Sequence, residues 1–146
     1  MPVTKVEFHS RVPDRLQYAC RLLRKAAASS AQVLVTADED TLQRFDELLW
    51  NFSSTDFVPH CFHDAPLPLL EHTPLVLNPS PQAHATRLTL LNLGSEVPVG
   101  FEQFTRIIEI VSNDANDKHD ARSRWKRYAT AGCELSNREL APAAPQ

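Results

Sequence analysis

Residues 31–37 read AQVLVTA, and residues 38–41, which follow directly, read DEDT. The first stretch is an almost continuous run of apolar and β-branched residues, the composition of a strand that is covered on both faces of a sheet. The second stretch places acidic side chains at the start of a helix, where the helix dipole stabilises negative charge. Together they predict a β-strand followed at once by an α-helix, which is the repeating unit of an α/β fold.

Similar but weaker patterns lie on both sides of this unit. Upstream, residues 4–10 (TKVEFHS) predict a strand, and Pro13 with Asp14 suits the first turn of a helix, where the missing N–H of proline costs nothing. Downstream, short apolar runs predict strands at 74–78, 87–93 and 106–112, and a final helix is predicted over 113–132. The alternation predicts a three-layer α/β domain with a mostly parallel central sheet of about five strands and helices on both faces.

The bulk composition is that of one ordinary domain. Its 146 residues carry a net charge of −3, so the overall charge does not attract the chain to nucleic acid. The three cysteines have no CxxC spacing, and we expect them to be reduced thiols. The N-terminal stretch MPVTKVEFHS lacks the features of a signal peptide, and no apolar run approaches the length of a membrane span, so we expect a cytoplasmic protein without membrane association.

Motifs for catalysis and nucleotide binding are missing from the sequence. The chain has three glycines, Gly94, Gly100 and Gly132, and none lies in the first predicted strand-to-helix turn, where a phosphate-binding loop needs them. There is no GxSxG motif and no recognisable catalytic-cysteine context. We therefore predict no catalytic residue and no cofactor. Catalytic groups that converge only in space leave a small α/β enzyme open as an alternative.

The end of the second predicted helix, within residues 48–63 (LLWNFSSTDFVPHCFH), is rich in aromatic side chains. At 100° per residue its apolar residues form one stripe, and Trp50 points away from the centre of that stripe. Trp50 either folds back over the sheet edge or forms an exposed apolar patch with Phe57 and Val58, of the kind that anchors a protein interface. The stripe consists of Leu42, Phe45, Leu48, Leu49 and Phe52.

The same stretch contains a small cluster of potential metal ligands. His60, Cys61 and His63 carry imidazole and thiolate groups that zinc accepts. Successive residues of a strand point to opposite faces, so His60 and Cys61 would diverge. A turn with polar surface histidines and a buried thiol is favoured, and no metal site is predicted.

Basic residues gather on the final predicted helix. Lys118, Arg122 and Lys126 follow one another at helical i, i+4 spacing, on a face that Trp125 adjoins, and Arg124 continues the positive charge around the helix. A basic helix beside an apolar pocket suits an acidic peptide that ends in an aromatic residue or a free carboxylate. A solvated basic face with two half-buried aromatic side chains is the plainer alternative.

Two segments resemble the chi subunit family of bacterial DNA polymerase III. Residues 44–60 (RFDELLWNFSSTDFVPH) resemble that family's LDxxLW helix end followed by FVPH, and residues 121–136 (ARSRWKRYATAGCELS) resemble its ARxRYKxYRxAGxxL pattern. The order of elements and the chain length agree as well, whereas the middle of the chain matches mainly in outline. The sequence departs from the pattern in having Trp125 where tyrosine is usual and Cys133 where a larger apolar residue is common.

The resemblance implies a Rossmann-like fold without a working nucleotide site, and a non-catalytic accessory subunit of the clamp-loader assembly of DNA polymerase III that acts in DNA replication. The implied partners are the psi subunit and the acidic C-terminal tail of single-stranded DNA-binding protein. By matching motif, psi is expected at Trp50 and Phe57, with Val58 of the same apolar patch beside them, a surface that a helicase-like repair protein is expected to share. The tail is expected, by the same matching, at Arg122, Trp125 and Lys126 of the final helix, and the charges of Lys118 and Arg124 are expected to add to that surface.

We expect a single domain over residues 1–136 and a flexible tail over residues 137–146. The chain is expected at the bacterial replisome, where it reaches nucleic acid only through its partners. The alternative is a protein that binds single-stranded nucleic acid directly with its basic final helix. The net acidity and the confinement of the positive charge to one helix disfavour that alternative.

Overall fold

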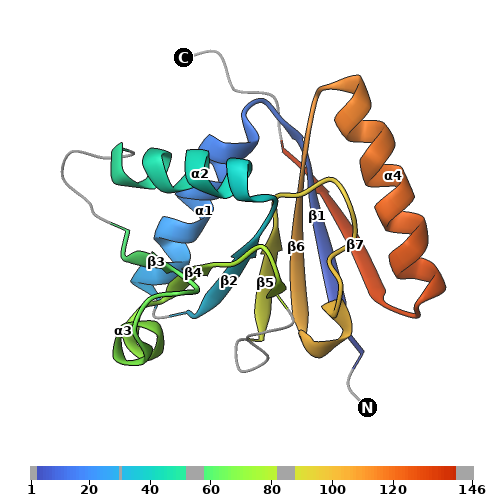
Figure 1. Cartoon of the computed structure of the whole chain (residues 1–146). Helices are drawn as coiled ribbons and strands as arrows, with labels where there is room; N and C mark the ends of the chain where they lie inside the picture. The colour runs from blue at the N-terminus through green and yellow to red at the C-terminus, as the bar shows by residue number, and fades with distance from the viewer. Residues whose placement is uncertain (1–2, 30, 52–57, 82–87, 141–146) are drawn as a thin grey trace.

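The computed structural model describes residues 3–29, 31–51, 58–81 and 88–140 of the chain (Figure 1). Strands and helices alternate through most of this length. In chain order the elements are β1 (Lys5–Val12), α1 (Arg15–Ala28), β2 (Val33–Thr36), α2 (Glu39–Asn51), β3 (His60–Phe62), α3 (Leu67–His72), β4 (Leu75–Leu77), β5 (Thr89–Asn92), the 3₁₀ helix η2 (Phe101–Gln103), β6 (Arg106–Ser112), α4 (Ala115–Thr130) and β7 (Glu134–Glu139).

Within the described residues, one seven-stranded sheet forms the centre of the fold, and each strand runs parallel to its neighbours. The strand order is β3-β4-β2-β5-β6-β1-β7. α1 and α2 cover one face of the sheet and α4 covers the other, which gives three layers (Figure 1). The predicted α/β class, the parallel sheet and the helices on both faces are confirmed.

The expected number of about five strands is wrong, because the sheet has a further strand at each edge. β3 is only three residues long and lies in the stretch interpreted as a turn. β7 is mostly exposed and has Leu135 as its one apolar residue. Edge strands need no continuous apolar run, so the pattern that reveals central strands could not detect these two. β7 also continues to Glu139, past the expected domain end at residue 136, and residues 141–146 of the expected tail lie outside the described part of the chain.

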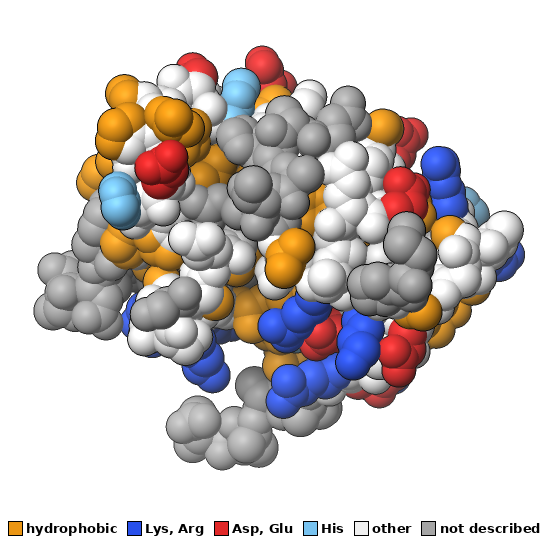
Figure 2. All heavy atoms as spheres, turned by 90° about the horizontal axis from the view of Figure 1, so that it is seen from below, with side chains coloured by type: hydrophobic (Ala, Val, Ile, Leu, Met, Phe, Trp, Pro, Cys, Tyr) orange, Lys and Arg blue, Asp and Glu red, His pale blue; other side chains and the backbone are white. Residues whose placement is uncertain are grey.

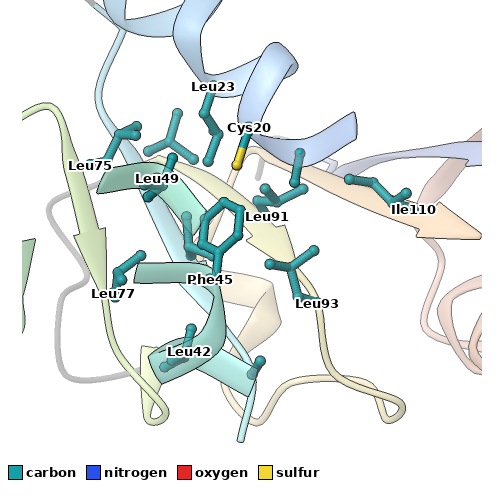
Figure 3. Packing of buried hydrophobic residues seen from close by; sticks show 14 of the residues in the cluster. Cys20, Leu23, Leu42, Phe45, Leu49, Leu75, Leu77, Leu91, Leu93 and Ile110 are labelled. Carbon is teal, nitrogen blue, oxygen red and sulfur yellow. The ribbon is translucent and has the colours of Figure 1, made fainter. Parts of the chain in front are cut away.

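A large apolar core fills the space between the sheet and the layer of α1 and α2 (Figure 3). α1 contributes Cys20, and α2 contributes Leu42, Phe45 and Leu49 from the stripe predicted for it. Phe45 is completely buried, with side chains from both helices and from the strands around its ring. A phenylalanine in such a place stabilises a fold by about 3–5 kcal/mol relative to alanine. Phe52, also expected on the stripe, lies outside the described residues.

A second apolar cluster on the opposite face fixes the position of α4. Tyr128 of α4 is fully buried, and its ring lies edge-on to Phe101 of η2 and to Phe8 of β1, with centroids 5.3 and 6.1 Å apart. These contacts hold one side of α4 on the sheet and leave its basic side facing outward.

The longest described helix is α4, with 16 residues, and it is rich in charged side chains. None of the helices in the described part of the chain combines the length and the apolar content that crossing a bilayer requires.

Candidate functional site

A groove of about 680 Å³ lies between α4 and the neighbouring strands β1, β6 and β7, and we call it the α4 groove. Its apolar lining comes from Phe8, Val111, Ala121 and Trp125. Its basic lining comes from Arg11, Lys118, Arg122 and Lys126. Apolar surface beside positive charge suits a ligand that carries both an aromatic group and carboxylates.

The start of α4 explains how its basic residues come to line this groove. The side chain of Asp114 caps the helix by accepting a hydrogen bond from the backbone N–H of Asp117, at 3.0 Å. From that start, Lys118, Arg122 and Lys126 recur about once per turn, and all three line the α4 groove. The common face predicted from their spacing is confirmed, whereas their role in binding stays a prediction.

Trp125 forms part of the wall of the α4 groove. Its indole ring is half-buried and packs on Phe8 of β1, with centroids 5.1 Å apart and ring planes inclined by 53°. The indole is therefore held against the sheet with its remaining surface turned to the groove. This arrangement is compatible with the peptide-binding groove and equally with a solvated basic face that carries half-buried aromatic side chains.

Arg124 does not belong to this groove, and the expectation that it contributes to the tail-binding surface is wrong. Its side chain is 2% exposed, its Nε donates a hydrogen bond to Glu109 at 3.0 Å, and its Nη1 donates to the carbonyl oxygen of Ser95 at 3.0 Å. Two residues of α-helix turn a side chain by about 200°, so Arg124 faces the sheet when Arg122 faces the groove. Its spacing from buried Ala121 and Tyr128 was the feature of the sequence that indicated this.

Glu109 is the centre of the buried polar network that Arg124 joins. Besides Arg124, its carboxylate accepts hydrogen bonds from the Tyr128 hydroxyl at 2.7 Å and from the Asn92 amide at 2.9 Å. Burial raises the pKa of Glu109, while the charge of Arg124 and the three hydrogen bonds act in the opposite direction. The network ties α4 to β5 and β6 in the interior.

Trp50, near the C-terminal end of α2, is 59% exposed, which confirms that it lies off the core stripe. Its indole stands edge-on to the ring of His60, with centroids 5.4 Å apart. The His60 ring is held on both sides: Nδ1 lies 2.7 Å from the carbonyl oxygen of Val58, and Nε2 lies 2.8 Å from the carboxylate of Asp46. The His60 side chain is only 1% exposed, so the interpretation of this histidine as a surface residue is wrong. Trp50 and the His60 ring that supports it form what we call the Trp50 surface.

The other two residues expected at this surface have different outcomes. Val58 is 1% exposed and packs into the core between the sheet and α1 and α2, so the expectation that it forms part of an exposed patch is wrong. Burial of an apolar side chain of this size stabilises a fold by about 1.5–3 kcal/mol, which favours the inward orientation wherever the core is within reach. Phe57 lies outside the described residues, and its role stays a prediction.

Metal binding finds no support in the geometry around the histidines. Both ring nitrogens of His60 already face oxygen acceptors, and His63 is exposed. Within the described residues, no group of three or more histidine, cysteine, aspartate or glutamate side chains is placed to hold a metal ion.

A second hollow, of about 390 Å³, lies at the carboxyl ends of β2 and β5. Parallel α/β folds often bind nucleotides at such a place. Here the rim carries Asp38 and Glu96, whose negative charges oppose a phosphate, and Gly94 is the one glycine that lines it. The lining therefore does not favour nucleotide binding.

Comparison with known proteins indicates one family. A family model described as "DNA polymerase III chi subunit, HolC" matches residues 3–136. Three bacterial proteins named DNA polymerase III subunit chi are similar to this chain. The Pseudomonas aeruginosa protein is 34% identical over 145 residues, which cover 94% of this chain and 98% of that protein. The Haemophilus influenzae protein is 29% identical over 126 residues, covering 85% and 86%, and the Escherichia coli protein is 27% identical over 127 residues, covering 82% of each. Because these similarities extend over most of its length, this chain belongs to the DNA polymerase III chi subunit family, whose members are non-catalytic accessory subunits of the polymerase complex that acts in replication.

Proposed function

We propose that this chain joins two replication proteins at separate surfaces. The α4 groove binds the acidic C-terminal tail of single-stranded DNA-binding protein, and the Trp50 surface binds the psi subunit. Psi connects the chain to the clamp loader, and the tail connects it to the coated template strand, at the replisome in the cytoplasm. The Trp50 surface is also the place where a helicase-like repair protein would compete with psi.

The observation that carries this proposal is the composition of the α4 groove. Three α4 cations and an indole line one groove, on the side of α4 that faces away from the Arg124 anchor. Arg122 presents a planar guanidinium that can donate two parallel hydrogen bonds to a terminal carboxylate. Trp125 and Phe8 offer an aromatic wall to the terminal side chain of the tail. Lys118 and Lys126 add positive charge, which attracts the acidic residues that precede the terminal residue of the tail.

The Trp50 surface supports the second half of the proposal through its rigidity. Exposed tryptophans are frequent anchors of protein interfaces, and an anchor that is already held in place loses less entropy on binding. His60, fixed by Asp46 and by the Val58 carbonyl, holds the indole of Trp50 from the protein side. α2 and α4 lie on opposite faces of the sheet, so both partners can bind at once (Figure 1).

Direct binding of single-stranded nucleic acid is the weaker alternative. Seen from below, lysine and arginine side chains lie in several places on this face, with acidic side chains beside and between them (Figure 2). The chain as a whole is acidic, with a net charge of −3. A binder of phosphate backbones needs a broader positive surface than the one side of α4 supplies.

Calorimetric titration with an acidic peptide of about ten residues, ending in phenylalanine with a free carboxylate, tests the α4 groove. We expect micromolar affinity that weakens as salt rises, because the contacts are charged and partly exposed. Arg122→Ala should weaken binding by about 1.5–3 kcal/mol, the range for a hydrogen bond to a charged group.

Arg127→Ala is the matched control, because Arg127 is an exposed arginine of α4 that does not line the α4 groove. It should bind the peptide as the wild type does. Equal affinity of the wild type and Arg122→Ala contradicts the proposal. Bare single-stranded DNA that binds as tightly as the peptide favours the nucleic-acid alternative.

A further inference from the structure

Arg11, which the sequence did not indicate as a binding residue, has an unusual backbone conformation beside the α4 groove. Its φ angle is 61°, and it is the one residue other than glycine with a positive φ among those the structure describes. A side chain with a Cβ atom rarely adopts this region, and such residues are frequent at binding sites. A feature of the surrounding structure must therefore hold Arg11 at this positive φ.

The register of β1 gives that reason. His9 pairs with Ile110 of β6 and Val12 pairs with Ser112, so two residues of β1, Ser10 and Arg11, stand opposite one residue of β6. This arrangement is a β-bulge, which often redirects a side chain next to a functional site.

The bulge reverses the face to which Arg11 points. Phe8 packs on the α4 side of the sheet and His9 contacts Tyr18 of α1 on the other side. Regular alternation would send Arg11 to the α1 side and Val12 to the α4 side. Instead, Val12 is buried in the core with α1, and Arg11 lines the α4 groove.

A carboxylate of the same chain already faces Arg11. Arg11 Nε lies 3.7 Å from Glu139 Oε2, and the two side chains are 60% and 58% exposed. Glu139 comes from β7, whose residues pair with β1 in parallel register, and it is the one acidic side chain among the described residues that line the α4 groove. An exposed ion pair of this kind is weak and readily exchanged.

We propose that Arg11 binds acidic side chains that precede the terminal residue of the ligand, and that these displace Glu139 from it. This inference rests on the proposed function of the α4 groove. Arg11 stands on the strand side and Lys118, Arg122 and Lys126 stand on the helix side, so a peptide in the groove meets positive charge on both walls. The ion pair with Glu139 shows that Arg11 can bind a side-chain carboxylate at this place. The terminal carboxylate of the ligand is then bound by Arg122.

Arg11→Gly separates binding from folding, because glycine adopts a positive φ without strain and keeps the bulge while removing the charge. Its unfolding temperature should equal or exceed that of the wild type, and its affinity for the acidic peptide should fall about two- to five-fold. A second peptide, with the acidic side chains replaced by amides, should bind Arg11→Gly and the wild type equally. A third, with an amidated C-terminus, should bind Arg122→Ala and the wild type equally.

Glu139→Gln tests the displaced carboxylate. It should tighten binding of the acidic peptide about two-fold in the wild-type background, because the ligand no longer competes with an internal anion. It should have no effect in the Arg11→Gly background. Tightening of the same size in both backgrounds would overturn the proposed displacement.

The outcomes separate the two proposals. If Arg122→Ala weakens binding and Arg11→Gly does not, the role of Arg11 is overturned and the proposed function stands. If the wild type and Arg122→Ala bind alike, the proposed function itself fails. If Arg11→Gly lowers both stability and affinity, the Arg11→Lys variant separates the two effects, because lysine keeps the charge and meets the same backbone strain as arginine. Wild-type affinity in Arg11→Lys supports the proposal, and affinity as low as that of Arg11→Gly overturns it.

Discussion

His9 lies between β1 and α1, where its Nδ1 is 2.5 Å from the hydroxyl of Tyr18. Burial lowers the pKa of His9; Arg138 and Arg106 act in the same direction, and Glu7 acts against them. The neutral ring is therefore the form that suits the fold. Protonation of a histidine in such a place opposes folding.

We expect the free energy of unfolding to decrease below about pH 6.5 because of His9. Its pKa in the folded chain is below the unfolded value, so the unfolded chain takes up the proton first as the pH falls. The contribution of His9 is thus complete above about pH 6.5 and is lost on the way down to the folded-state pKa. Urea unfolding at about pH 7.5 and about pH 5.5 should show a smaller difference in stability for His9→Gln than for the wild type.

His119→Gln is the control for that measurement, because His119 is exposed on α4. It should retain the pH dependence of the wild type. An undiminished pH dependence in His9→Gln would show that other groups cause it.

The ring of His60 is a contact that we expect to keep the Trp50 indole in its orientation. Removing the imidazole leaves the indole without the ring it stands against and frees Asp46 from its partner. In a Trp125→Phe background, where Trp50 is the one remaining tryptophan, His60→Ala should lower the fluorescence anisotropy of Trp50 and weaken co-purification of psi. His63→Ala, at an exposed histidine nearby, should change neither quantity. A psi complex that survives His60→Ala unchanged would contradict the positioning role.

α4 is the element on which the proposed function depends, and its two sides have different tasks. One side carries the cations of the α4 groove, and the other is fixed to the sheet by Arg124, Tyr128 and their shared partner Glu109. Desolvation of both charges offsets much of the attraction in this buried ion pair, so an intact pair adds little net stability.

Breaking that ion pair from one side should be costly. Arg124→Met leaves Glu109 buried without its cation and is expected to destabilise the fold by about 3–5 kcal/mol in urea unfolding. Adding Glu109→Gln should recover part of the loss, because the amide is neutral and its oxygen still accepts from Tyr128. Equal stability of the single and the double variant would show that the charge of Glu109 is not what Arg124 compensates.

The two sides of α4 also show what sequence reasoning can and cannot resolve. The i, i+4 spacing of Lys118, Arg122 and Lys126 was enough to place them on one face. The charge of Arg124 alone favours that surface, whereas its spacing from Ala121 and Tyr128 puts it on the buried stripe. Arg11 could not be found at all, because a bulge depends on pairing between strands that are distant in the sequence.

At the scale of the whole molecule, apolar patterning predicted the class of fold because five strands and the main helices carry continuous or periodic apolar residues. The edge strands β3 and β7 were missed, since their sequences HCF and ELSNRE lack that pattern. β7 matters to the proposed function, because it closes one side of the α4 groove and brings Glu139 to Arg11. α2, which carries Trp50, and α4 cover opposite faces of the sheet (Figure 1), so the Trp50 surface and the α4 groove are separated.

The chain has two tryptophans, Trp50 and Trp125, one at each proposed surface, so their indole N–H signals report on the two surfaces separately. The most direct test of the account is a titration of the ¹⁵N-labelled protein with the acidic peptide, followed by nuclear magnetic resonance. We predict that the Trp125 indole signal and the backbone amides of Arg11 and Arg122 shift to saturation while the Trp50 indole signal stays in place. A shift of the Trp50 signal without one at Trp125, or no shift at either, would contradict the central claim that the α4 groove binds the tail.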